Sequence, residues 1–276
     1  MTHRRGEPPE RSWLRRRVVD ELRYESERWP LWRWDLNLRY VAKSLLHVPV
    51  PRVSERAGWH RWREWMTALP RPSADPVTTL AAIGDLMWLR EGYGGFLSEG
   101  TAAALRRGRG LVANLETPID PHAPVRRWAL ETLRYNAPAE YLAPLIGLGL
   151  DAVALSLCNN HALDQGQGGL ARTREVVQGR GFACLGGAGG RDEAVGVIEV
   201  DGVRIALFAT TFGINHDEAR APAGVPVVAF GDRRRGCDWR VVEELVARAR
   251  SCAPQLVVAV PHWGFEYEHW PDTATR

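Results

Sequence analysis

From about residue 76 onward, short apolar runs alternate with longer segments of helical periodicity, a pattern that is typical of an α/β domain. The apolar runs that predict strands cover residues 77–83, 110–114, 151–157, 195–200, 203–210 and 255–260. Helical periodicity covers residues 169–178 and 238–250, and a further helix is expected to end over 141–148. Asp201-Gly202 predicts a tight hairpin between the fourth and fifth runs, because both residues tolerate a positive φ.

Residues 1–75 differ from the rest of the chain in composition. A proline-rich stretch separates them from the domain over residues 76–276. Helices are expected over 13–28 and 54–69. Seven of the twelve tryptophans lie in this part of the chain: Trp13, Trp29, Trp32, Trp34, Trp59, Trp62 and Trp65. Basic and aromatic residues together would suit a membrane surface or a nucleic acid, but acidic residues interrupt the basic face. We therefore favour a Trp/Arg-rich helical extension that packs on the domain, with the membrane surface as an alternative.

Composition narrows the function classes. The chain is 45% hydrophobic and 25% charged, which suits a globular protein with a substantial core, and its net charge of +3 is too weak to argue for nucleic acid. The four cysteines are widely spaced, which argues against a zinc ribbon and favours reduced thiols. With no apolar run long enough to cross a membrane and no recognisable secretory signal, we expect a cytoplasmic protein, peripheral to the membrane if residues 1–75 bind its surface.

Polar side chains able to bind a metal follow four of the predicted strands. They are Asp85 after the first, Asn114 and Glu116 at the second, Asn159, Asn160 and His161 after the third, and His262 after the last. Each is a weak signal alone, but side chains at the carboxyl ends of successive strands converge in an α/β sheet. Carboxylate, amide oxygen and imidazole groups together suit Mn, Fe, Zn or Mg, and such mixed sets are typical of two-metal hydrolytic sites.

Four ordered motifs coincide with these strand ends. They are IGDLM at 83–87, ANLETPI at 113–119, NNHALDQG at 159–166 and PHWGFEY at 261–267. In order and spacing the set resembles the signature of the CapA (poly-γ-glutamate capsule synthesis) family, a branch of the calcineurin-like metallophosphoesterases. The resemblance implies a sandwich of two mixed sheets flanked by helices, and a divalent metal site, with two ions expected.

The resemblance also implies a role for individual residues. Asp85 would ligate the first metal, and Glu116 stands where related phosphoesterases have a bridging carboxylate. Asn160 and His262 would ligate the second metal. His161 would be the acid that protonates the leaving oxygen, which suits an imidazole because its pKa lies near neutral pH. Asp164 would either orient His161 or cap the helix that follows.

The chain departs from the family pattern in two places. Met87 stands where the wider superfamily has a histidine ligand, as is general in the CapA branch. The family also continues to a Gly-His-His-Pro-His segment that supplies final ligands, whereas this chain ends at Arg276, so we expect an incomplete domain. A fragment, a partner chain that completes the site, and an N-terminal extension that covers the exposed edge are all open explanations.

The leading hypothesis is a metal-dependent phosphoesterase-like protein, implied to act on a phosphoester or anionic polymer in capsule or poly-γ-glutamate synthesis. The alternative, from another class, is a catalytically impaired scaffold or accessory subunit of a biosynthetic assembly.

Overall fold

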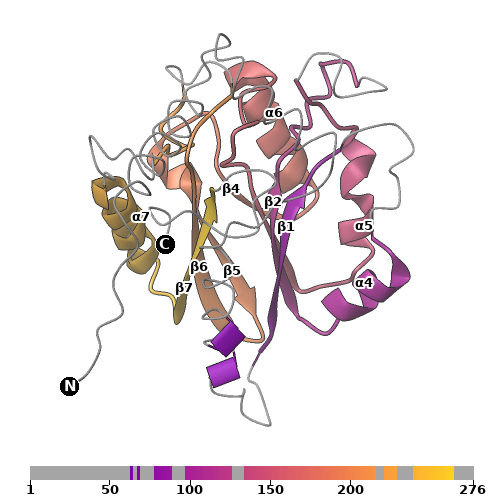
Figure 1. The fold of residues 1–276 in the computed structure, drawn as a ribbon, viewed down its shortest axis with the longest axis vertical. Coiled ribbons are helices and arrows are strands. Elements are labelled where there is room, and N and C mark those ends of the chain that lie inside the picture. The colour runs from indigo at the N-terminus through magenta and orange to yellow at the C-terminus, as the bar shows by residue number, and fades with distance from the viewer. Residues whose placement is uncertain are drawn as a thin grey trace, which may run out of the picture. The chain divides into compact units, whose positions relative to one another are not determined.

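The computed structural model describes residues 63–64, 67–68, 78–88, 97–125, 134–215, 221–228 and 239–263. The chain divides into two compact units. Of the first (Met1–Ala68, Gly231–Arg235 and Gly264–Arg276), only residues 63, 64, 67 and 68 are described, and these are helical, as the predicted helix over 54–69 requires. The second (Leu69–Phe230 and Gly236–Trp263) contains every described strand (Figure 1). The helix predicted over 13–28 lies outside the described residues, and the domain boundary near residue 75 stays a prediction.

The first sheet has four described strands in the order β1-β2-β3-β4, and all neighbours are parallel. They are β1 (Leu80–Leu86), β2 (Gly110–Leu115), β3 (Ala152–Ser156) and β4 (Ala183–Leu185). A helix lies in each connection between consecutive strands, as parallel pairing requires. The expectation of two mixed sheets is therefore wrong for the described strands of this sheet, which are parallel throughout.

The second sheet is mixed, as predicted, with the order β5-β6-β7. Its strands are β5 (Val195–Val200), β6 (Val203–Thr211) and β7 (Leu256–His262). β5 and β6 pair antiparallel, and β7 lies parallel to β6. Asp201 and Gly202 join β5 to β6 with φ angles of 51° and 75°, so the predicted hairpin is confirmed.

Helical segments connect and cover these strands (Figure 1). They are α4 (Glu99–Leu105), η2 (Ala139–Leu142), α5 (Ala143–Ile146), α6 (Gly166–Gly179), η3 (Arg191–Ala194) and α7 (Trp239–Ser251). α6 packs against β4, and α7 packs against all three strands of the second sheet. The α/β class predicted from the alternating pattern is therefore confirmed for the described residues.

Two glycines allow the two sheets to approach closely. A Cβ atom at Gly196 in β5 would lie 2.6 Å from Cδ2 of Leu185, and one at Gly110 in β2 would lie 2.7 Å from Cγ2 of Val200. Both distances are too short for a real side chain, so only glycine fits at these positions without movement. The two sheets therefore pack closely at these positions.

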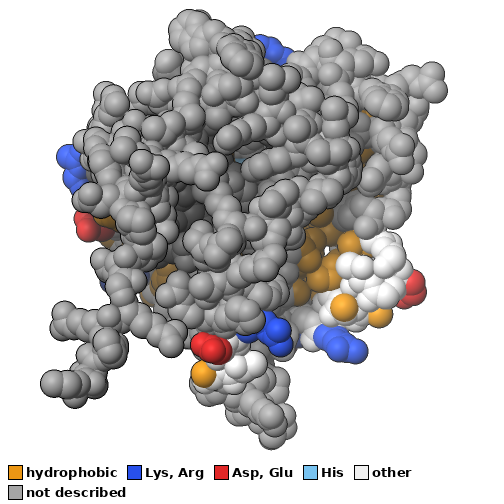
Figure 2. Space-filling view, in the orientation of Figure 1, with side chains coloured by type: hydrophobic (Ala, Val, Ile, Leu, Met, Phe, Trp, Pro, Cys, Tyr) orange, Lys and Arg blue, Asp and Glu red, His pale blue; other side chains and the backbone are white. Residues whose placement is uncertain are grey.

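On the face shown in Figure 2, the described Lys and Arg side chains (blue) lie at separate points and form no continuous patch. Within the described part of the chain, no helix is both long and apolar enough to cross a membrane.

Candidate active site

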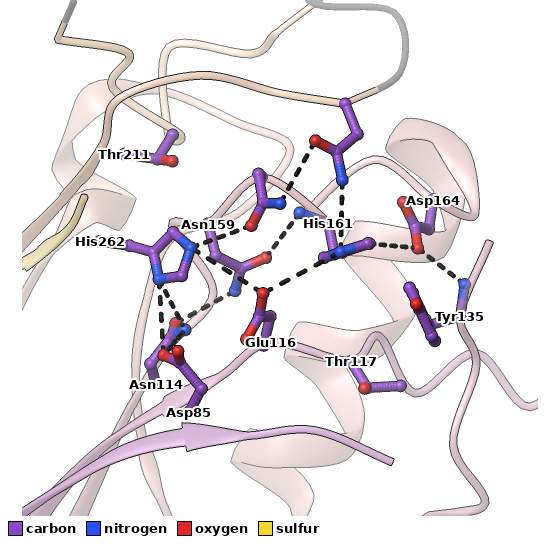
Figure 3. A network of polar contacts seen from close by, with 12 residues as sticks. Asp85, Asn114, Glu116, Thr117, Tyr135, Asn159, His161, Asp164, Thr211 and His262 are labelled. Atoms are coloured by element: carbon purple, nitrogen blue, oxygen red, sulfur yellow. Dashed lines mark hydrogen bonds and ion pairs between the residues drawn. The ribbon is translucent and has the colours of Figure 1, made fainter. Parts of the chain in front are cut away.

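Polar side chains from both sheets meet at the carboxyl ends of β1, β2, β3 and β7 (Figure 3). The structure brings together all six residues for which metal or catalytic roles were predicted: Asp85, Glu116, Asn160, His161, Asp164 and His262. The roles themselves stay predictions.

A bulge in β1 sets the direction of Asp85. Ala82 pairs with Val112 and Asp85 pairs with Asn114, so three steps along β1 match two along β2. A bulge changes the side to which the following residues point, and Gly84 supplies a position without a side chain there. Asp85 and His262 were expected to follow their strands; both lie within them.

Asp85, Asn114 and His262 form one corner of the site. Asn114 Nδ2 donates to Asp85 Oδ1 at 2.7 Å and lies 3.1 Å from His262 Nδ1. His262 Nδ1 lies 3.5 Å from Asp85 Oδ1. The contact with His262 holds the pKa of Asp85 below its ordinary value, Asn114 lowers it further, and burial opposes both. The Asp85 carboxylate is therefore ionised at neutral pH.

Glu116 lies between the two histidines. Its Oε1 is 4.0 Å from His161 Nε2 and 3.9 Å from His262 Nε2. The Glu116 side chain is only 10% exposed, so its charge is screened little by solvent. His262 Nε2 is also 2.9 Å from Asn160 Oδ1, which completes a line of polar groups between the two sheets.

Asn159 holds the turn that follows β3. Its Nδ2 donates to Asn114 Oδ1 at 3.1 Å and to the carbonyl oxygen of Leu115 at 2.9 Å, and its Oδ1 accepts from the backbone N–H of His161 at 3.1 Å. The side chain is buried, so these bonds are protected from water. Asn159 therefore fixes the backbone that presents Asn160 and His161.

His161 and Asp164 form a buried pair. His161 Nδ1 lies 2.8 Å from Asp164 Oδ2, which also accepts from the backbone N–H of Tyr135 at 2.7 Å. The Tyr135 ring packs edge-on against the imidazole, with centroids 4.5 Å apart. The N-cap of α6 is Gln165, with no side-chain capping bond. Of the two roles considered for Asp164, the contacts support orientation of His161.

Asn215 is a site residue that the sequence analysis missed. Its Nδ2 lies 3.2 Å from His161 Nε2, and its Oδ1 accepts from Asn160 Nδ2 at 3.3 Å. It lies after the end of β6, so the strand-end argument applied to four other strands could have found it. Tyr135 was also missed, because its loop position carries no periodic signal.

A comparison with known protein families covers the whole site. The family model described as Bacterial capsule synthesis protein PGA_cap matches residues 79–276. The chain belongs to this family. The CapA resemblance seen in the four motifs is thereby confirmed, and PGA_cap membership points to a role in capsule or poly-γ-glutamate synthesis. A comparison with curated proteins gives no match.

The PGA_cap family is metallophosphoesterase-like, so the fit of these residues to a metal can be tested on their geometry. Within the described ranges, no three or more His, Cys, Asp or Glu side chains are arranged to hold a metal ion. Asn amides make up part of the cluster, and its donors bond to one another. The chemical types of the donors in the cluster still fit a divalent metal, because carboxylate, amide oxygen and imidazole groups suit Mn, Fe, Zn or Mg.

The separations of these donors agree with that fit. His262 Nε2 lies 2.9 Å from Asn160 Oδ1 and 3.9 Å from Glu116 Oε1. Two ligands that share a cation at about 2.1 Å lie about 3 to 4 Å apart. Both separations lie close to this range.

Proposed function

We propose that this chain is a metal-dependent phosphoester hydrolase that acts in capsule or poly-γ-glutamate-type polymer synthesis. Family membership supports the biosynthetic setting. The observation that carries the hydrolase proposal is the position of Glu116, whose Oε1 faces Nε2 of His161 at 4.0 Å and Nε2 of His262 at 3.9 Å. A buried carboxylate between two imidazoles from different sheets is a suitable centre for a two-metal site.

Four residues would hold the metal. Asp85 would ligate one ion, Asn160 and His262 the other, and Glu116 would bridge them. Divalent ions bound there would polarise a phosphoryl oxygen and activate a water at neutral pH. The ionised Asp85 carboxylate lies beside the His262 imidazole, so a negative charge and a nitrogen ligand are both available to a metal here.

His161 would supply the proton to the leaving oxygen. Asp164 Oδ2 engages Nδ1 at 2.8 Å, so Nε2 is the nitrogen that faces the site. The carboxylate fixes the direction of the ring. A protonated imidazole would give the hydrogen on Nε2 to the departing ester oxygen and would return to the neutral form, with the hydrogen on Nδ1 still bonded to Asp164.

Metal content and turnover together test the proposal. After reconstitution with Mn²⁺, elemental analysis should find about two metals per chain, and bis(p-nitrophenyl) phosphate should be hydrolysed. His161→Ala should abolish turnover of an ester with a poor leaving group while metal content stays largely intact. Unchanged turnover of that ester in His161→Ala would remove His161 from the mechanism.

A scaffold without catalysis is the second candidate. It is favoured by the mutual hydrogen bonds of the donors and by the share of neutral Asn amides among them. A chain that binds no Mn²⁺ on reconstitution and hydrolyses no ester would support this role over the hydrolase.

A further inference from the structure

The pairing of β1 with β2 ends at a side chain instead of a backbone group. The two strands pair up to Leu86 and Leu115, and the backbone N–H of Glu116 then donates to the carbonyl oxygen of Leu86 at 3.1 Å. In a regular parallel ladder, the next bond would run from the N–H of Trp88 to the carbonyl oxygen of Glu116. That N–H donates instead to the side-chain hydroxyl of Thr117, at 2.9 Å.

Thr117 is enclosed and conformationally restricted. Its side chain is fully buried, and Trp88 is nearly so. Pro118 follows it and confines Thr117 to extended backbone conformations, while the branch at Cβ restricts rotation of the side chain. In Figure 3, no dashed line joins Thr117 to another of the residues drawn. Its hydroxyl therefore contacts the backbone that follows β1 instead of the polar cluster.

Glu116 lies between these two bonds to the β1 side. Its own N–H makes the first, and the residue that follows it, Thr117, makes the second. The partners on the other side, Leu86 and Trp88, come shortly after Asp85 along the chain. The two bonds therefore join the backbone segments that carry Asp85 and Glu116. Contacts of this kind, made behind the ligands, set the direction in which the ligands are presented.

A second buried threonine hydroxyl bonds the loop after β2 from another element. Thr173 Oγ1 on α6 accepts from the backbone N–H of Ile119 at 3.0 Å and donates to the carbonyl oxygen of Gly169 at 2.8 Å. The Thr173 bond thus connects the loop to a helix, whereas the Thr117 bond connects it to β1. Of these two bonds, the one made by Thr117 joins the segments that carry the two carboxylates.

We propose that Thr117 is a positioning residue, whose hydroxyl extends the β1–β2 ladder and so holds the Asp85 and Glu116 carboxylates at a fixed separation for divalent cations. The inference rests on the proposed function for the metal, whereas the extended ladder is a property of the chain with or without a cation. Thr117 itself contacts neither a cation nor a substrate.

Manganese affinity tests the positioning role. Thr117→Val keeps the branched shape and removes the hydroxyl, so Mn²⁺ titrated calorimetrically into the chelator-treated full chain should bind about ten-fold more weakly than to wild type. Thr117→Ser keeps the hydroxyl and should bind Mn²⁺ as wild type does. Thr173→Val is the matched control, because it removes a buried hydroxyl that bonds the same loop. It should lower the midpoint of denaturant unfolding and leave Mn²⁺ affinity unchanged.

The outcomes of this titration are separable. Unchanged affinity in Thr117→Val, or equal losses in Thr117→Val and Thr173→Val, would overturn the proposal, because the hydroxyl would then contribute only to stability. Thr117→Ala leaves room for a water to bond the Trp88 N–H and carries the same expectation, should Thr117→Val not fold.

Amide hydrogen exchange, followed by NMR in the metal-free full chain, distinguishes this inference from the proposed function. The Trp88 N–H should exchange slowly in wild type, Thr117→Ser and Thr173→Val, and faster in Thr117→Val. Equally slow exchange in Thr117→Val and wild type would overturn the extended ladder whether or not Mn²⁺ binds. If wild type binds no Mn²⁺, the hydrolase proposal and the role of Thr117 toward a cation both fail, whereas loss of protection in Thr117→Val would still uphold the ladder.

Discussion

Asp164 concentrates two hydrogen bonds on one carboxylate oxygen. Oδ2 accepts from the backbone N–H of Tyr135 at 2.7 Å and engages His161 Nδ1 at 2.8 Å, and the side chain is fully buried. A charged acceptor makes both bonds stronger than a neutral one would, and it fixes which ring nitrogen carries hydrogen. Asp164 is thus the residue on which the direction of His161 depends most.

Asp164→Asn should therefore impair the proton step. The neutral amide either accepts more weakly or turns its NH₂ group toward Nδ1, which forces the other tautomer of His161. We expect kcat for diphenyl phosphate to fall by about a hundred-fold, with Mn²⁺ content retained. Steady-state kinetics beside Glu199→Gln, the same kind of change at an exposed strand position, would check this. A kcat within two-fold of wild type would show that Asp164 does not act through His161.

Most of the site could be predicted because it obeys one rule of parallel sheets. Side chains at the carboxyl ends of neighbouring strands converge, and Asp85 and Glu116, from β1 and the end of β2, do so. His262 joins them from β7 of the second sheet. What the sequence could not reveal were features set by contacts far along the chain. Asn215 reaches His161 only because a turn after β6 folds back, and Asp85 faces the site because of a register shift against β2.

At the scale of elements, α6 is tied to the loop after β2 by a charged pair outside the site. Arg172 donates to both oxygens of Asp120, each at 2.6 Å, and Asp120 is almost fully buried. Asn136 bonds the backbone N–H and carbonyl of the same residue at 2.7 and 3.0 Å. Because Tyr135 precedes Asn136, this cluster supports the loop whose backbone contacts Asp164.

The Asp120–Arg172 pair should make stability depend on acid pH. Arg172 holds the pKa of Asp120 below its ordinary value of 3.8, so the pair stabilises the fold above the unfolded-state pKa, and the contribution is lost as pH falls through the folded-state pKa. Asp120→Asn should accordingly lower the free energy of unfolding at pH 7, and its difference from wild type should shrink below about pH 4.

Denaturant unfolding between pH 7 and pH 3 would measure this difference. Asp151→Asn is a matched control, because Asp151 also pairs with an arginine, Arg109, but both side chains are more than a third exposed. Its effect at pH 7 should be small. A difference between wild type and Asp120→Asn that stays constant over the whole range would contradict a role for the charge of Asp120.

Elements with their own periodicity were predicted well, and short ones were not. β2 and β3 are apolar runs bounded by turn residues, and α7 has a clear helical period, so local pattern alone sufficed. β4 has only three residues and is a strand because it pairs with β3. α4 has only seven residues, and its local signals are the N-cap Ser98 and the acidic first-turn residue Glu99. Tertiary contact, which a single sequence does not display, decides such cases.

At the scale of the whole described domain, the site draws its donors from both sheets. Asp85, Glu116 and Asn160 come from the first sheet or the turns after its strands, and His262 comes from β7 of the second. Asn160 and His262 meet directly, with Oδ1 and Nε2 2.9 Å apart. A cation held by these groups would cross-link the sheets in the folded protein and would lose its site on unfolding.

Metal binding should therefore raise the thermal stability of the domain. A ligand that binds only the folded state stabilises it by about 2.7 kcal/mol at a concentration one hundred times its Kd. We expect the Tm of wild type to rise steadily with Mn²⁺ concentration, measured by calorimetry on chelator-treated protein.

Glu116→Gln and His262→Gln should lose most of this rise, because one removes the central carboxylate and the other the donor from the second sheet. Glu199→Gln, the same change as at Glu116 but at an exposed position of β5, should keep it. An equal rise in all four proteins would mean that Mn²⁺ binds elsewhere, and the cluster would then be a hydrogen-bonded joint between the sheets instead of a metal centre.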